Sequence, residues 1–207
     1  NGSPLYSEVD NSLPRQLLVI TFEGGGGIIP KELQGLDWIL TEILQEGSKN
    51  LVGDAYRKKL FLLNSDIYFS RKPRALNVLI KAPEKNLREV LNLFYDVISN
   101  PNLTVENFNR VKEQVLNARA ISDNEMRSVT FYYALRDVFK YHPDTLDSTG
   151  SISSIKNITF EKINEYYSKI FDFNHAFYNT LGKARENFVK NEINKAFFRK
   201  VGGKFSD

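Results

Sequence analysis

The stretch that most constrains this chain is residues 35–48, which read GLDWILTEILQEGS. Its apolar residues recur three and four positions apart, the spacing of one buried stripe on an α-helix: Leu36, Ile39, Leu40, Ile43 and Leu44. Trp38, Thr41 and Glu42 share a neighbouring face at the same helical spacing. Gly47 ends the helix, because glycine tolerates the left-handed conformation of a C-cap. The pattern predicts a helix with one buried face and, beside it, a face that is a candidate site.

Composition excludes several classes of protein. The 207 residues are 42% hydrophobic and 26% charged, so the chain can bury a sizeable core. The net charge of +3 is too small and too mixed in sign to indicate nucleic-acid binding. No apolar run approaches the roughly 20 residues of a membrane helix. No signal peptide is visible, which fits a processed chain or an excised piece of a longer one.

The chain has no cysteine, which excludes disulfides and thiolate zinc sites. This absence fits the cytoplasm and the bacterial periplasm equally, so the compartment stays unknown.

The order of elements predicts an α+β fold. Residues 1–15 are polar, with two prolines, and are interpreted as an arm or linker, and residues 16–207 as a single module. Apolar runs predict strands over residues 17–22, 66–70, 76–81 and 176–181. Helical periodicity predicts helices over residues 31–46, 54–63, 83–99, 125–141 and 186–200, and behind the N-caps Thr104 and Thr159. Since strands and helices do not alternate strictly, we expect an antiparallel sheet covered by helices on one face.

Few residues are candidates for chemistry. His142 and His175 would need a carboxylate to form a zinc site. The favoured interpretation places His142 at a helix-to-loop corner and His175 at a strand end. The glycines of residues 24–27 precede a helix, as in phosphate-binding loops, but Ile28-Ile29-Pro30 intervenes. A strand-to-helix loop is the favoured interpretation. The serines of residues 144–157 are interpreted as loop residues.

A series of markers between residues 16 and 183 resembles one module of the pitrilysin/insulinase (M16) zinc metallopeptidase family, which includes mitochondrial processing peptidase. No single marker is specific, and the resemblance depends on their order and spacing. The markers are Gly35-Leu36, Glu46-Gly47-Ser48-Lys49, the strand pair near 66–82, Asn100-Pro101, Phe108-Asn109-Arg110-Val111-Lys112, His142-Pro143, Thr159-Phe160-Glu161, Tyr166-Tyr167 and a strand ending at Gly182. The resemblance implies the LuxS/MPP-like metallohydrolase fold.

Active members of that family carry the motif His-x-x-Glu-His on the matching helix. Histidines at i and i+4 face the same way and hold one Zn²⁺, and the glutamate activates its water. Aligned here, the two histidines fall on Trp38 and Glu42, the glutamate base on Thr41, and the distal glutamate ligand near Ala118. No ligand position holds the expected residue. The resemblance therefore implies a degenerate module with no catalytic, cofactor-binding or metal residue.

The resemblance also implies a role. Homologous modules of the family close around a peptide, and we expect zinc only in a catalytic partner module, in the same chain or in a partner subunit. The Arg-x-x-x-Gly-Leu-x-Tyr motif of the family's second half is not found, so the chain resembles the module beside that one. We expect a module, inactive alone, that shapes the peptide-binding chamber of a larger zinc peptidase. The alternative is a structural or partner-binding relative with no role in proteolysis.

Overall fold

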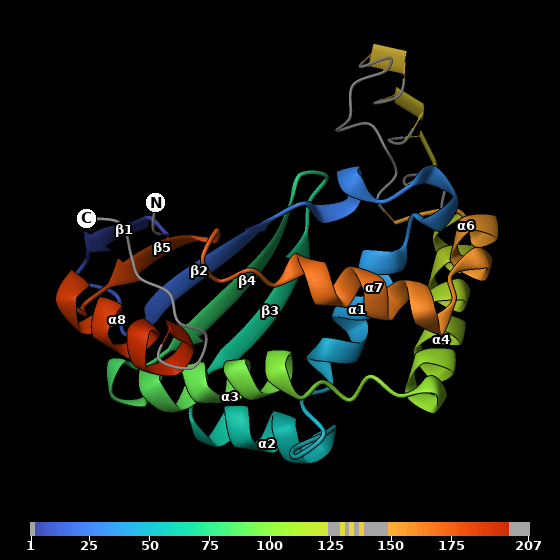
Figure 1. The fold of residues 1–207 in the computed structure, drawn as a ribbon. Coiled ribbons are helices and arrows are strands. Elements are labelled where there is room, and N and C mark those ends of the chain that lie inside the picture. The colour runs from blue at the N-terminus through green and yellow to red at the C-terminus, as the bar shows by residue number, and fades with distance from the viewer. Residues whose placement is uncertain (1–2, 124–128, 131–132, 135–136, 139–148, 199–207) are drawn as a thin grey trace.

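The computed structural model describes residues 3–123, 129–130, 133–134, 137–138 and 149–198. Its centre is a five-stranded sheet with the order β1-β5-β2-β4-β3 (Figure 1). The strands are β1 Leu5–Val9, β2 Gln16–Glu23, β3 Asp66–Arg71, β4 Ala75–Ala82 and β5 Phe177–Gly182. The four strands predicted from apolar runs are all present, and the strand pair expected near residues 66–82 forms the antiparallel hairpin of β3 and β4.

The first strand corrects the interpretation of residues 1–15. Within this predicted arm, β1 pairs with β5 in parallel, with Leu5 opposite Tyr178 and Val9 opposite Gly182. The other pairs in the sheet are antiparallel, so the sheet departs from the predicted pattern only at this edge. The short strand carries the exposed Tyr6 and Glu8, and its partner lies at the other end of the chain. The residues of β1 therefore give little local indication that this segment pairs with β5.

The helices largely follow the apolar periodicity. They are α1 Leu36–Gln45, α2 Asp54–Leu62, α3 Leu87–Ser99, α4 Val105–Asp123, α6 Ile152–Asn157, α7 Phe160–Ile170 and α8 Glu186–Ile193. Short 3₁₀ turns cover Gly25–Ile28, Lys31–Leu33 and Glu84–Asn86, and a π-helical turn covers Asn194–Phe198. The predicted helix over residues 125–141 lies mostly outside the described residues. Among the described residues, no helix has both the length and the apolar character needed to cross a membrane.

Two boundaries differ from the prediction, each because of local backbone chemistry. The helix predicted over residues 31–46 is divided at Gly35, whose φ of 95° lies in the left-handed region and separates the turn at Lys31–Leu33 from α1. The loop predicted over residues 144–157 is wrong in its last part, which forms α6. Ser151 and Ser154 begin that helix with a capping box, each side chain bonding the other's backbone N–H.

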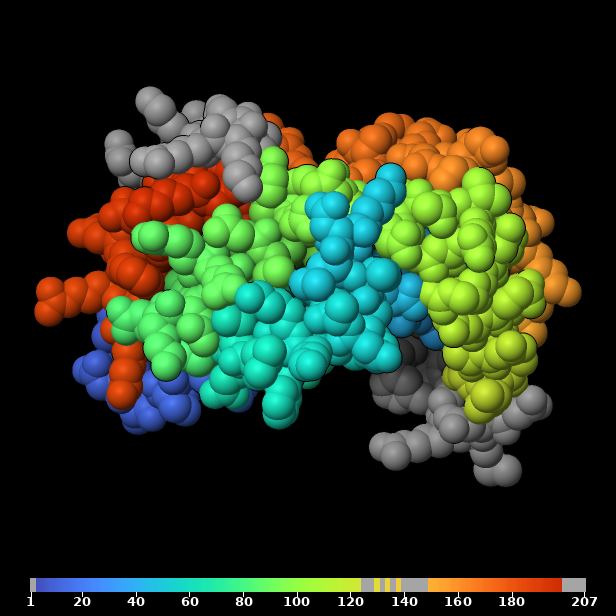
Figure 2. Space-filling view, turned by 90° about the horizontal axis from the view of Figure 1, so that it is seen from below, coloured from blue at the N-terminus to red at the C-terminus, as the bar shows by residue number. Residues whose placement is uncertain are grey.

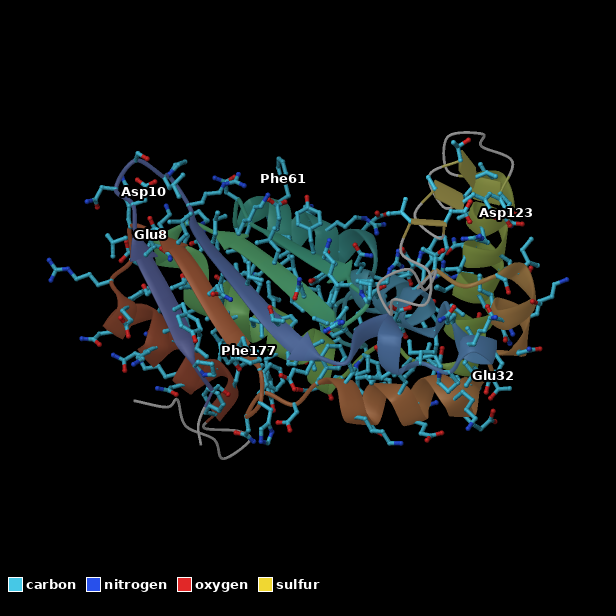
Figure 3. The ribbon with its side chains drawn as sticks, turned by 90° about the horizontal axis from the view of Figure 1, so that it is seen from above. Glu8, Asp10, Glu32, Phe61, Asp123 and Phe177 are labelled. Carbon is cyan, nitrogen blue, oxygen red and sulfur yellow. The ribbon has the colours of Figure 1, made fainter. Side chains whose placement is uncertain are left out.

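The sheet has one covered face and one open face. Along β2 and β4 buried and half-exposed residues alternate, so Leu18 and Ile80 face the helices while Val19 and Leu79 face outward. Figure 2, seen from below, shows α2, α3 and α8 over the covered side, and Figure 3 shows the open side with Glu8 and Phe177 labelled. The predicted α+β fold with helices on one face is confirmed. The helices α1, α4, α6 and α7 gather at one end of the sheet (Figure 1).

Candidate functional site

The candidate site lies on α1, which the core holds by its apolar side. The predicted stripe is buried, and none of its five residues is more than 3% exposed: Leu36, Ile39, Leu40, Ile43 and Leu44. As predicted, Gly47 ends the helix in a left-handed conformation, with φ of 103°. Its N–H donates a hydrogen bond to the carbonyl oxygen of Leu44. This packing fixes the direction of the second face, which carries the positions matching the zinc motif.

The second face of α1 is a connected polar surface. The indole Nε1 of Trp38 donates a hydrogen bond to Oε1 of Glu42 at 3.1 Å, across one helical turn. The buried Thr41 hydroxyl donates to the carbonyl oxygen of Trp38 at 3.0 Å. The three side chains at the positions of the two histidines and the glutamate base therefore bond within their own helix.

A cation from another element joins this face. Arg71, the last residue of β3, places its Cζ atom 4.9 Å from the ring centroid of Trp38. Its NH1 group makes a long hydrogen bond of 3.5 Å to Oγ1 of Thr41. Burial lowers the pKa of Arg71, and the negative charges of Asp37 and Glu42 act in the opposite direction. One guanidinium thus interacts with all three positions that match the motif.

Sequence reasoning missed Arg71, because 30 positions separate it from Thr41. Only the fold brings the end of β3 to α1. The one local signal is a charged residue at the end of a strand pattern, and such residues are ordinarily solvated.

The glycine run positions this arginine. The backbone N–H of Gly24 donates to the carbonyl oxygen of Arg74 at 3.1 Å, and that of Gly26 to Lys72 at 3.2 Å. A Cβ atom on Gly25, whose φ is 58°, would lie 2.2 Å from the Lys72 carbonyl oxygen, so only glycine fits there. These N–H groups, which a phosphate would need, are bonded to the hairpin that follows Arg71. The run is a strand-to-helix turn built against that hairpin.

A buried carboxylate lies beside the guanidinium. Asp37 is 1% exposed, and among the described residues no side chain donates a hydrogen bond to its carboxylate. Burial raises the pKa of Asp37 to about 6, although the charge of Arg71 acts to lower it. The hydroxyl of Tyr166, on α7, is also buried and has no hydrogen-bond partner within the described ranges. Burial and the nearby charge of Asp37 raise the pKa of Tyr166. Asp37 and Tyr166 were not among the sequence-predicted site residues.

The residues present do not fit a zinc ion. Structural and catalytic zinc sites need three or four nitrogen, sulfur or oxygen ligands. Of the positions matching the family's ligands, Trp38 offers an indole N–H, which cannot accept a metal, and Ala118 offers no donor and lies exposed on α4. Glu42 alone is a metal ligand by type, and it accepts the Trp38 hydrogen bond. Within the described ranges, no three His, Cys, Asp or Glu side chains come together as a metal site.

The two histidines, for which separate structural places were favoured over a zinc pair, form no metal site in the described part of the chain. His175 lies just before β5, with its exposed ring Nδ1 2.7 Å from Oδ2 of Asp172. His142 lies outside the described residues. The fold and the site together define an α+β module whose helix in the metal-binding position carries an indole, a hydroxyl and a carboxylate around an arginine.

No family model matches the chain. Among curated proteins, the chain is 21% identical over 171 residues to the non-peptidase homolog YmxG of Helicobacter pylori, covering 83% of this chain and 40% of YmxG. It is 23% identical over 171 residues to subunit 1 of the mitochondrial cytochrome b-c1 complex of Bos taurus, covering 82% of this chain and 35% of that subunit. The chain thus spans two fifths or less of the length of these relatives.

Solved structures of similar proteins have the same fold as this chain. A protease from Helicobacter pylori superposes with a TM-score of 0.85 at 20% identity, covering 100% of this chain and 49% of that one. An inactive M16 peptidase domain from Pseudomonas fluorescens superposes with a TM-score of 0.83 at 17% identity, covering 100% of this chain and 50% of that one. The predicted resemblance to the M16 family is confirmed: the chain has the fold of an inactive M16 domain, and the positions aligned with the zinc motif hold Trp38, Thr41 and Glu42.

Proposed function

We propose that the chain is a non-catalytic M16-like module that forms part of the wall of a peptide-binding chamber. In this proposal zinc and hydrolysis belong to another module, in the same chain or in a partner subunit. The replaced ligand positions at Trp38, Glu42 and Ala118 support the lack of zinc here. Similarity to an inactive M16 domain and to a non-peptidase homolog supports it further. The greater length of these relatives supports a homologous module as the partner.

The open face of the sheet is the observation on which the chamber role rests. Half-exposed apolar residues of three neighbouring strands line a hollow of about 420 Å³, among them Val19, Leu79 and Leu181. The helices cover the opposite face, so this side of the sheet has no layer above it in the described chain (Figure 3). Apolar side chains that stay uncovered on a sheet favour a role in contacting another molecule. An extended peptide is the occupant we propose.

A photo-crosslinking experiment tests the proposed role. A photoreactive amino acid replaces Leu79 on the open face or, as a control, Phe61, which is 80% exposed on α2. We expect the Leu79 variant, assembled with its catalytic module, to crosslink a bound peptide, and the Phe61 variant not to. Equal labelling of both variants would contradict a peptide-facing sheet.

Metal analysis tests the proposed lack of catalysis. The isolated chain is expected to carry no stoichiometric zinc and to cleave no peptide. Stoichiometric zinc, or cleavage that a chelator blocks, would overturn the proposal.

A second candidate is a structural or partner-binding role without proteolysis. The similarity to a subunit of the cytochrome b-c1 complex favours it. The two candidates differ in whether a His-x-x-Glu-His motif occurs elsewhere in the full-length gene or in a neighbouring gene. They also differ in the crosslinking experiment, because the second predicts that Leu79 crosslinks a protein partner and never a peptide.

A further inference from the structure

We infer that the polar face of α1 is a binding site for a guanidinium cation, and that the chain fills it from within by Arg71. The inference concerns the helix on which the family's metal motif would lie, and it does not depend on the proposed chamber role. The evidence comes from the contacts, the charge balance and the position of Arg71.

The contacts around Arg71 are of the kinds that a guanidinium group makes. Its planar cation lies over the face of the Trp38 indole, and such a pair is attractive because of the ring's negative face. Its NH1 group reaches the Thr41 hydroxyl. Glu42 contributes a carboxylate, which the Trp38 N–H holds in place. A lysine ammonium would lack the planar surface that stacks on the indole.

The charge balance also requires a cation at this point. The Asp37 carboxylate is buried, and no side chain in the described part of the chain donates a hydrogen bond to it, so the charge of Arg71 compensates it. A buried charge without a partner is strongly unfavourable. Removing Arg71 would leave Asp37 and Glu42 without their counter-ion, and only the protonation of Asp37 would relieve this.

The position of Arg71 gives the site a mechanical role. Arg71 ends β3, which is an edge strand of the sheet. The residues after it, 72–74, accept hydrogen bonds from the glycine turn at residues 24–27. Arg71 therefore joins the hairpin to α1. The glycine turn, which follows β2, joins the same hairpin to β2.

Chemical rescue tests this inference on the full chain. We expect Arg71→Ala to lower the Tm by about 10 °C near neutral pH, since it uncovers a buried charge. Guanidinium chloride at about 20 mM, far below denaturing concentrations, should restore a large part of that loss, and sodium chloride at equal ionic strength should not. The wild type and Arg74→Ala, which removes a charge from the same hairpin, serve as controls without rescue.

The fluorescence of Trp38 supplies a second measurement, which a change in stability alone would not alter. Trp38 is the chain's single tryptophan, so its emission reports directly on the cation above it. Guanidinium should return the emission of Arg71→Ala toward that of the wild type and saturate at millimolar concentration. A linear response without saturation, or no restoration of Tm, would overturn the inference.

A conservative variant keeps the test decisive if Arg71→Ala does not fold. Arg71→Lys retains the charge and loses the planar group, so its Tm and its Trp38 emission should both differ from those of the wild type. A lysine variant identical to the wild type in both measurements would show that the site requires only a charge, and would overturn its assignment as a guanidinium site.

Discussion

The two faces of α1 belong to one ten-residue helix, yet different forces hold them. The apolar face packs into the core through five residues that are almost wholly buried. The polar face carries Trp38, Thr41 and Glu42, and its main contact outside the helix is the guanidinium of Arg71. The comparison teaches that the apolar face packs the helix into the core, while the polar face joins the helix to the end of β3 through one cation.

The two faces of α1 also differ in how well they tolerate substitution. Apolar packing is lost in proportion to the volume removed, and the cost cannot be offset by another residue far away. A polar face needs only that its charges and hydrogen bonds be balanced, and several sets of residues can do this. In this chain the balance comes from Arg71, which is supplied by a different strand.

The largest expected effect comes from the apolar face. Leu40→Ala leaves a cavity in the core and should lower the free energy of unfolding by about 2–5 kcal/mol. Urea unfolding followed by circular dichroism measures the change. Leu62→Ala, at a position that is 69% exposed on α2, is the matched control and should stay within about 0.5 kcal/mol of the wild type. Similar losses for the two variants would contradict the contrast drawn here.

The next effect concerns Asp37 and depends on pH. The folded state binds the Asp37 proton more tightly than the unfolded state, because burial raises the pKa from 3.8 to about 6. The free energy of unfolding should therefore fall as the pH rises from about 4 to about 6, by about 3 kcal/mol in total. Asp37→Asn should remove this fall and be more stable than the wild type above pH 6.

Denaturant unfolding over that pH range measures the effect. Asp54→Asn is the control, because the Asp54 side chain is 99% exposed, and it should keep the pH dependence of the wild type. If Asp37→Asn retained the same slope, the buried carboxylate would not be the group responsible.

A graft of the family motif tests the alignment of the polar face. Replacing Trp38 and Glu42 by histidine, and Thr41 and Ala118 by glutamate, should create a weak zinc site, and adding Arg71→Ala should strengthen it by removing the competing cation. Zinc at a hundred times its Kd would then add about 2.7 kcal/mol to stability. Calorimetric titration measures the binding. A folded graft that binds no zinc would show that the site helix is misaligned.

The smallest effect is expected for a hydrogen bond within the polar face. Glu42→Gln keeps an acceptor for the Trp38 N–H and removes the charge, so it should cost about 1 kcal/mol or less. Thermal unfolding of this variant beside Leu40→Ala compares the two faces directly. A loss as large as that of the core variant would contradict the small contribution assigned to the hydrogen bond between Trp38 and Glu42.

The sequence by itself determined the helices and strands whose apolar spacing is strong. Examples are α1, with its stripe from Leu36 to Leu44, and the hairpin of β3 and β4. It also predicted, through the resemblance, that the positions aligned with the zinc motif hold Trp38, Thr41 and Glu42 in place of the expected residues. These conclusions need only local periodicity and residue type, which one segment carries within itself.

Only the tertiary structure decided the rest. The strand β1 pairs with β5 across nearly the whole chain, and Arg71 meets Trp38 and Thr41 because the sheet brings the end of β3 to α1. The burial that raises the pKa of Asp37 likewise depends on elements far away in the chain. Long-range pairing and desolvation are properties of the packed state, so no local pattern of residues contains them.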